Sequence, residues 1–375
     1  MTHQFSPDGN GFLRAVGRTA RGLAPVLAFT GACMSAAAAD DGPLRLVWQE
    51  VIPETSAPYL ASAAGNVLIS TTNGELRALS AGSGEPAWSR LLAGGLAGAP
   101  VEVSDRIAVP AQDRTLLILD GASGETVGSY VTRTLAPLLV ETPPGLLIAD
   151  RDGGVGLISF ASGIESWNAT LPAPATTAGM CGDQLMVGMA DGSLALLNPA
   201  DGAISWNRPL GGPITTPPLC RDRSVWIGSA DNRLYALRLR RRGCRMRGSF
   251  RTGGDLTGAP IAFGERLLFF SYDTYVYSID AGNGHLTWKA RLGLRPADRA
   301  VLAGSLLLIA ARNAERLDIF RLPEGVQEPS WGLETGRERF VTPPLLAGDV
   351  IVAGAAFYGR QSSRLIALGL ATTDP

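Results

Sequence analysis

A hairpin turn that returns every 39 to 42 residues is the feature that most limits what this chain can fold into. In each copy an Asn or Asp lies in a turn between two apolar runs: Asn73, Asp113, Asp152, Asp191, Asp231 and Asp273. Tight hairpins need backbone with positive φ, which Asn, Asp and Gly accept at little cost. The flanking runs, such as residues 67–70 and 225–228, are short and apolar, as buried strands are. A repeat of this length and content predicts the four-stranded blade of a β-propeller.

Tryptophan recurs with the same period. Trp48, Trp88, Trp167, Trp206, Trp288 and Trp331 are separated by one or two repeats. In four copies the tryptophan follows a glycine by four residues: Gly84, Gly163, Gly202 and Gly284. The glycine fits a turn with positive φ. We expect the tryptophan to open the next strand and to pack its large surface against the neighbouring blade.

The starts of the repeats give the number of blades. They fall near Ala57, Pro100, Pro137, Pro174, Pro217, Ala259, Arg299 and Pro343, about 41 residues apart. Paired-helix arrays have a similar period, but they need helix formers and few glycines, whereas this chain has 46 glycines. The sequence therefore predicts an all-β fold, an eight-bladed β-propeller of four-stranded blades.

Closure of the ring follows from the register of the repeats. Residues 44–52 carry a tryptophan strand before the first complete repeat. The last repeat ends at residues 365–368 with no such strand after it. We expect the N-terminal strand to complete the last blade, so that only short, protected blade edges remain. Residues 40–375 would then form a single propeller domain.

Residues 1–39 have the composition of a targeting segment. Arg14, Arg18 and Arg21 precede a short apolar run over residues 22–32, with no acid among them. This order is typical of an export signal, and the run is shorter than the roughly 20 residues of a membrane-spanning helix. We therefore expect an exported protein whose leader is residues 1–39.

Two processing sites compete within this leader. Residues 37–39 are all alanine and precede Asp40, which fits the small-x-small rule for cleavage. Residues 30–33 end in Cys33 and resemble a lipoprotein box, in which Cys33 would be lipidated. The sequence leaves both open, so the protein is expected to be periplasmic, either free or anchored to the outer membrane as a lipoprotein.

Composition disfavours two classes of function. Lys and Arg number 33 against 34 Asp and Glu, so no overall field attracts nucleic acid. The histidines are His3, in the leader, and His285. A His-based metal site or a Ser-His-Asp triad would therefore have only His285 available outside the leader.

The run from Ala78 to Trp88, Ala-Leu-x-Ala-x-x-Gly-x-x-x-Trp, has an imperfect copy from Ile279 to Trp288. It resembles the repeat of pyrroloquinoline-quinone-type propellers, and the resemblance covers residues 44–370. One branch of this family comprises quinoprotein alcohol dehydrogenases, which hold the quinone and a calcium ion. Another is the propeller lipoprotein of the outer-membrane β-barrel assembly machinery, an eight-bladed scaffold that binds a barrel subunit.

The dehydrogenase branch implies features that this chain lacks. A vicinal cysteine pair is expected there, but Cys33, Cys181, Cys220 and Cys244 are all far apart. Acids such as Asp113, Asp152 and Asp191 recur with the hairpins and are better explained as turn residues. We therefore expect no enzyme, no catalytic residues, no cofactor and no metal.

One segment breaks the repeat with a cluster of charge. Where a Gly-x-x-x-Trp motif should lie, seven arginines occur between Arg238 and Arg251 with no acid among them. Arginine forks pair with two oxygens at once. The candidate partner-binding residues are Arg238, Arg240, Arg241, Arg242, Arg245 and Arg247. They could grip an acidic protein surface, lipid phosphate or polysaccharide; the alternative is a solvated outer hairpin.

The cysteines of the mature chain also leave alternatives. Cys181 and Cys220 occupy similar places, ten and eleven residues before Asp191 and Asp231, whereas Cys220 and Cys244 share a repeat. An oxidising compartment permits one disulfide. A Cys220–Cys244 bridge and buried free thiols are the two readings that the sequence leaves.

The function expected from all this is a non-enzymatic protein-binding scaffold in the bacterial cell envelope. Its partner would be another envelope protein, and the resemblance implies a subunit of the outer-membrane β-barrel assembly machinery. Membrane contact would come only through a lipid anchor, and nucleic acid is not an expected partner. The alternative is an extracytoplasmic quinoprotein-like or small-ligand-binding propeller.

Overall fold

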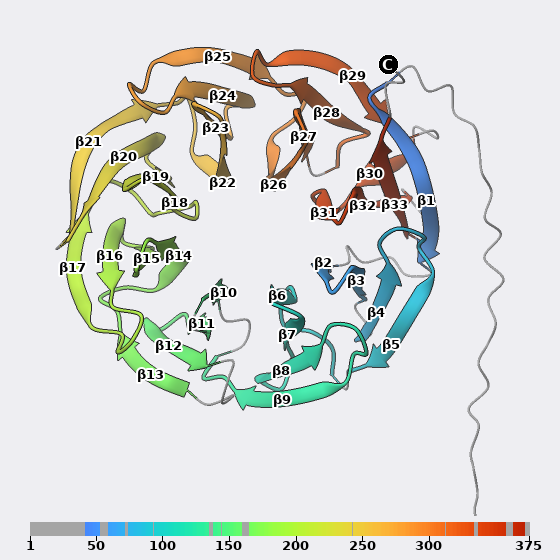
Figure 1. The fold of residues 1–375 in the computed structure, drawn as a ribbon, viewed down its shortest axis with the longest axis horizontal. Coiled ribbons are helices and arrows are strands. Elements are labelled where there is room, and N and C mark those ends of the chain that lie inside the picture. Colours follow the sequence, from blue (N-terminus) through green and yellow to red (C-terminus); the bar gives the residue numbers. More distant parts are fainter. Residues whose placement is uncertain are drawn as a thin grey trace, which may run out of the picture. The chain divides into compact units, whose positions relative to one another are not determined.

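The computed structural model describes residues 42–371, apart from 53–58, 72–73, 93, 135–137, 144, 160–164, 242, 312, 334–336 and 358–362. These described residues form β-strands and turns, gathered into eight sheets around a ring (Figure 1). No helix in this part of the chain is long and apolar enough to cross a membrane. The leader, with Cys33 and both processing sites, lies outside the described residues.

Each blade takes its strands from consecutive stretches of chain, and only blade 8 borrows one from elsewhere. Blades 1 to 4 comprise β2 (Tyr59–Ala63), β3 (Asn66–Ser70), β4 (Glu75–Ser80) and β5 (Pro86–Leu91); β6 (Val101–Val103), β7 (Arg106–Pro110), β8 (Thr115–Asp120) and β9 (Thr126–Val131); β10 (Leu138–Thr142), β11 (Gly145–Ala149), β12 (Gly154–Ser159) and β13 (Glu165–Thr170); and β14 (Ala175–Cys181), β15 (Gln184–Met189), β16 (Ser193–Leu197) and β17 (Ile204–Pro209).

Blades 5 to 8 continue the series. They comprise β18 (Leu219–Arg221), β19 (Ser224–Ser229), β20 (Arg233–Arg240) and β21 (Gly243–Arg251); β22 (Leu256–Phe263), β23 (Arg266–Ser271), β24 (Tyr275–Asp280) and β25 (Leu286–Arg291); β26 (Pro296–Ala303), β27 (Leu306–Ala311), β28 (Arg316–Arg321) and β29 (Val326–Gly332); and β30 (Glu338–Phe340), β31 (Leu345–Ala347), β32 (Val350–Phe357) and β33 (Ser363–Leu370) with β1 (Leu44–Ile52). The predicted eight-bladed all-β propeller is confirmed.

Burial changes from the inside of a blade to its outside. Second strands such as β11 and β27 are buried along their whole length, because neighbouring blades cover both of their faces. Fourth strands such as β5 and β9 are mostly half-exposed or exposed. The core therefore consists of apolar layers between successive blades, in separate clusters that each join two neighbouring sheets.

Blade 8 closes the ring as predicted. Strand β1 pairs antiparallel with β33, from Leu44 opposite Leu370 to Ile52 opposite Ser363. Figure 1 shows this join between the two ends of the described chain. A polar clamp reinforces it: the Arg364 guanidinium donates to Gln49 Oε1 of β1 at 2.7 Å and pairs with buried Glu338 of β30 at 2.6 Å.

At five seams the recurring tryptophan locks one blade to the next, as the sequence predicted for this residue. Trp48 and Trp88 lie on fourth strands, and each indole packs over a glycine in the outer turn of the following blade, Gly84 or Gly124. The indole N–H also donates to a carbonyl of that turn, from Trp48 to Ala81 at 2.8 Å and from Trp88 to Gly121 at 3.1 Å. The same N–H bond joins Trp167 to Pro199 and Trp288 to Pro323.

The glycine beneath each indole is required by space as well as by backbone shape. Gly202 has φ +71°, and a Cβ there would lie 2.3 Å from Trp167 Cε3. Gly284 holds the same turn position with φ +77°, but a Cβ there would meet nothing within 4 Å. These two glycines separate the cost of positive φ from the cost of displacing the ring.

This contrast gives a matched pair of substitutions. Gly202→Ala should destabilise the fold by roughly 1–3 kcal/mol more than Gly284→Ala, because only the first adds overpacking to a similar backbone strain. Urea unfolding of both variants, followed by tryptophan fluorescence, measures the difference. Equal losses would show that the indole moves aside freely.

Candidate functional site

The acids that recur with the hairpins are occupied by their own turns. Oδ1 of Asp113 accepts from the backbone N–H of Thr115 at 2.8 Å, and Oδ1 of Asp191 accepts from that of Ser193 at 2.9 Å. The pKa of Asp113 lies below its usual value because of these hydrogen bonds. In blade 3 the capping carboxylate is Asp150, which accepts from the N–H groups of Asp152 and Gly154.

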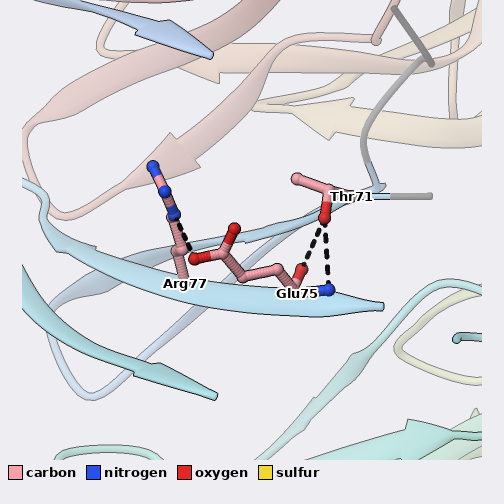
Figure 2. Close-up of polar contacts among 3 residues, drawn as sticks. All are labelled: Thr71, Glu75 and Arg77. Atoms are coloured by element: carbon pink, nitrogen blue, oxygen red, sulfur yellow. Dashed lines mark hydrogen bonds and ion pairs between the residues drawn. The ribbon is translucent and has the colours of Figure 1, made fainter. Parts of the chain in front are cut away.

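Blade 1 closes the same turn without an aspartate. The Thr71 hydroxyl donates to the Glu75 carbonyl at 3.1 Å and accepts from the Glu75 N–H at 3.2 Å (Figure 2). The Glu75 carboxylate pairs with Arg77 Nε at 2.7 Å on the same strand, as Figure 2 also shows. These groups therefore hold a hairpin together in the way that Asp113 and Asp191 do.

A hollow of about 510 Å³ lies at blades 6 to 8. Three of its charged groups are bonded to the protein itself: Arg339 pairs with Glu315 at 2.6 Å, and Asp318 accepts from the Gly293 N–H at 3.3 Å. Burial raises the pKa of the Asp318 carboxyl above its usual value. Within the hollow, the Arg339–Glu315 ion pair is thus compensated internally.

Within the part of the chain that the structure covers, no group of three His, Cys, Asp or Glu residues lies close enough together to hold a metal ion. The one described histidine, His285, is in the β24–β25 turn, where its backbone N–H donates to Asn283 Oδ1 at 2.8 Å.

The arginine cluster forms the outer hairpin of blade 5. Arg238 and Arg240 lie on β20, and Arg245 and Arg247 lie on β21, with Arg238 directly opposite Arg245. Arg241 is in the connecting turn, and Arg242 lies outside the described residues. The structure therefore brings five of the six predicted arginines onto one hairpin.

Alternation along β20 sorts this hairpin into two faces. Leu237 and Leu239 pack on blade 4 with Cys244 and Met246, in a cluster that includes Trp206. Arg238 and Arg240 fall on the opposite face, in register with Ala236, which packs on blade 6. The arginines thus lie at the outer seam between blades 5 and 6.

Most of these arginines have no acidic partner. Arg238, Arg240, Arg241 and Arg245 make no ion pair with any described residue, and all four are exposed. Arg247 donates through Nη2 to the Gly282 carbonyl of blade 6 at 3.0 Å. The predicted concentration of positive charge is therefore present as one surface.

The cysteine pairing expected within blade 5 is wrong. Cys220 is bonded to Cys181, with their Cα atoms 5.3 Å apart, and Cys244 is a buried free thiol. Cys220 and Cys244 lie on β18 and β21, the first and last strands of one sheet. Three strand spacings separate them by about 14 Å, well beyond the reach of a disulfide.

Cys181 instead ends β14 and Cys220 lies in the middle of β18, the innermost strands of two neighbouring blades. Inner strands converge toward the ring axis, so equivalent positions in adjacent blades come within bonding distance. The similar placement of these cysteines before Asp191 and Asp231 is the sequence signal that could have identified the pair. Burial raises the pKa of the Cys244 thiol to about 11.

Peptide mapping of the oxidised protein should recover a Cys181–Cys220 cross-link and an unmodified Cys244. The bridge closes a loop of 39 residues, for which loop entropy predicts up to about 4 kcal/mol of stabilisation. Reduction should therefore lower the urea midpoint of the native protein but not that of Cys220→Ser. Recovery of a Cys220–Cys244 peptide would contradict the assignment.

Comparison with known proteins identifies the family to which this propeller belongs. Residues 34–180 and 151–373 match the family model described as outer membrane protein assembly factor BamB. The two matches span nearly the whole propeller, so the chain belongs to the family of propellers with this pyrroloquinoline-quinone-type repeat, and within it to the group that the BamB description covers. No curated protein matches the sequence.

Two solved structures show the same fold at low identity. The computationally designed Ika8 protein has a TM-score of 0.70 at 12% identity, covering 86% of this chain and 98% of its own. BamB from Moraxella catarrhalis has a TM-score of 0.68 at 14% identity, covering 86% of this chain and 99% of its own. One neighbour is a designed protein and the other a natural one, so the ring alone does not specify a function.

Proposed function

We propose that this protein is a non-enzymatic binding scaffold of the bacterial cell envelope, and that it supports the assembly of outer-membrane proteins. Its partner would be a subunit of the machinery that builds β-barrels in the outer membrane. The family match over most of the propeller is the observation that carries this proposal.

The surface of the ring is consistent with such a role. The recurring carboxylates Asp113, Asp150 and Asp191 close their own turns. The exposed arginine hairpin of blade 5 is in contrast available to an acidic surface. A rigid ring that presents unpaired charge at one seam is suited to holding another protein in a fixed orientation.

The proposed location is the periplasm, with the chain free or anchored to the outer membrane through Cys33. Two features of the leader support this: the arginines before a short apolar run, and the lipoprotein-like residues that end at Cys33. The mass of the mature N-terminus distinguishes a lipidated Cys33 from cleavage before Asp40.

Affinity purification from detergent-solubilised envelope should recover an outer-membrane β-barrel protein with this chain. An unrelated eight-bladed propeller of similar charge on the same resin controls for capture by the fold alone. Repeated recovery of no barrel protein above that control would contradict the proposed role.

The absence of quinone chemistry is a separate part of the proposal. After incubation with pyrroloquinoline quinone and calcium, and then desalting, the protein should show no absorbance from bound quinone. The reason is that the recurring acids which could serve as calcium ligands are engaged with backbone N–H groups. A stoichiometric chromophore that resists desalting would favour a quinoprotein instead.

A further inference from the structure

Five seams between blades share one filled geometry. The pairs of ring and turn glycine are Trp48 and Gly84, Trp88 and Gly124, Trp167 and Gly202, Trp206 and Gly243, and Trp288 and Gly325. At every one of these glycines a Cβ would lie 2.3 to 2.7 Å from the nearest indole atom. A ring therefore fills the space above the glycine wherever the motif is complete.

The seam between blades 5 and 6 has the glycine but lacks the ring. Gly248 lies opposite Ala236 in β20, which is the register position that Trp288 holds opposite Ser278 in blade 6. A Cβ on Gly248, or on Gly284 in the following turn, would meet no atom within 4 Å. We call the space between Gly248 and Gly284 the vacant seam site.

The rest of this seam is intact. Arg247 Nη2 donates to the Gly282 carbonyl at 3.0 Å, much as Trp88 Nε1 donates to the Gly121 carbonyl at 3.1 Å in a filled seam. Nearer the core, Phe250 packs edge-on against Phe269 at 5.5 Å between ring centroids. The two blades are thus held together, while the space above Gly248 and Gly284 in the outer part of their contact is open.

Unpaired positive charge lies beside the vacant seam site. Arg238 and Arg245 are cross-strand neighbours on the face of the hairpin that is turned toward blade 6. Neither makes an ion pair with a described residue, and the carboxylate of the adjoining turn, Asp280, accepts from the N–H groups of Gly282 and Asn283. An open space above two glycines therefore adjoins two guanidinium groups that make no ion pair with a described residue.

From this geometry we infer that the vacant seam site receives an aromatic side chain, best an indole, from an extended segment of a partner protein in which acidic residues flank the aromatic one. The ring would lie on Gly284 as Trp167 lies on Gly202, and the flanking carboxylates would pair with Arg238 and Arg245. This inference rests on the proposed function, since it specifies how the scaffold recognises its partner.

Labelled peptides test the two halves of this recognition. Fluorescence anisotropy should show that the full protein binds an Asp-Glu-Trp-Glu-Asp peptide at least about tenfold more tightly than peptides with alanine for tryptophan or with amides for the acids. Equal binding of the alanine peptide would indicate a general anion site and overturn the inference. No binding of the first peptide would also overturn it.

Substitution of Gly248 gives the sharpest variant. Gly248→Trp supplies the missing ring from the chain itself and should abolish binding of the acidic tryptophan peptide. Gly128→Trp is its matched control, because Gly128 holds the same register position opposite Ile118 in blade 2, far around the ring, and should leave binding unchanged. Binding retained by folded Gly248→Trp would overturn the inference.

A second variant keeps the test decisive if a bulky side chain perturbs folding. Replacing exposed Arg238 and Arg245 together by serine should weaken the peptide complex at least about tenfold without moving the urea midpoint. Unchanged affinity would overturn the inference.

The same variants separate this inference from the proposed function. If wild type and Gly248→Trp capture the same barrel protein equally well from envelope, the scaffold role stands and the vacant seam site is not where the partner binds. If wild type captures none, the scaffold role itself fails, whatever the peptides show.

Discussion

The pairing of β1 with β33 is the contact on which the ring depends. Seven blades are built from strands that follow one another in the chain, and they would form an open arc without it. Because β1 comes from the other end of the sequence, its eight register pairs with β33 turn the arc into a closed ring. Arg364 secures the join by reaching both Gln49 of β1 and buried Glu338 of β30.

Within the closed ring the tryptophan and glycine pairs set how each blade lies against the next. Each buried or half-buried indole brings a large apolar surface to a seam, and its N–H bond adds about 1 kcal/mol when well formed. Glycine is needed for this contact, since a Cβ at Gly202 would lie only 2.3 Å from Trp167 Cε3. The seam between blades 5 and 6 lacks the ring, because Gly248 takes its register position, and there Phe250 and Arg247 hold the blades by other contacts. Gly128 takes the same register position in blade 2.

Local patterns sufficed to predict most of this fold. The turn and tryptophan periods give the number of blades, and the lone tryptophan strand around Trp48 predicts the closure, because both depend on features repeated along the chain. The repeat pattern does not predict the Cys181–Cys220 disulfide, because the two cysteines lie in different blades. They meet only because the inner strands converge toward the axis. The arginine hairpin was found from charge alone, but the vacancy beside it was not. The sequence does not distinguish Gly248 from other glycines. Only its register opposite Ala236 shows that it takes the position of the missing tryptophan.

The Cys181–Cys220 disulfide between β14 and β18 sets the order in which the blades unfold. It joins blades 4 and 5, on the side of the ring away from the β1–β33 clasp, which holds without a covalent bond. Unfolding that starts at the β1–β33 pairing would spread along the chain from both ends. It would reach blades 4 and 5, which the disulfide joins, last. In an oxidising compartment the middle of the sequence is therefore the part best placed to survive proteolysis as a compact fragment, and to serve as the template on which the outer blades reassemble.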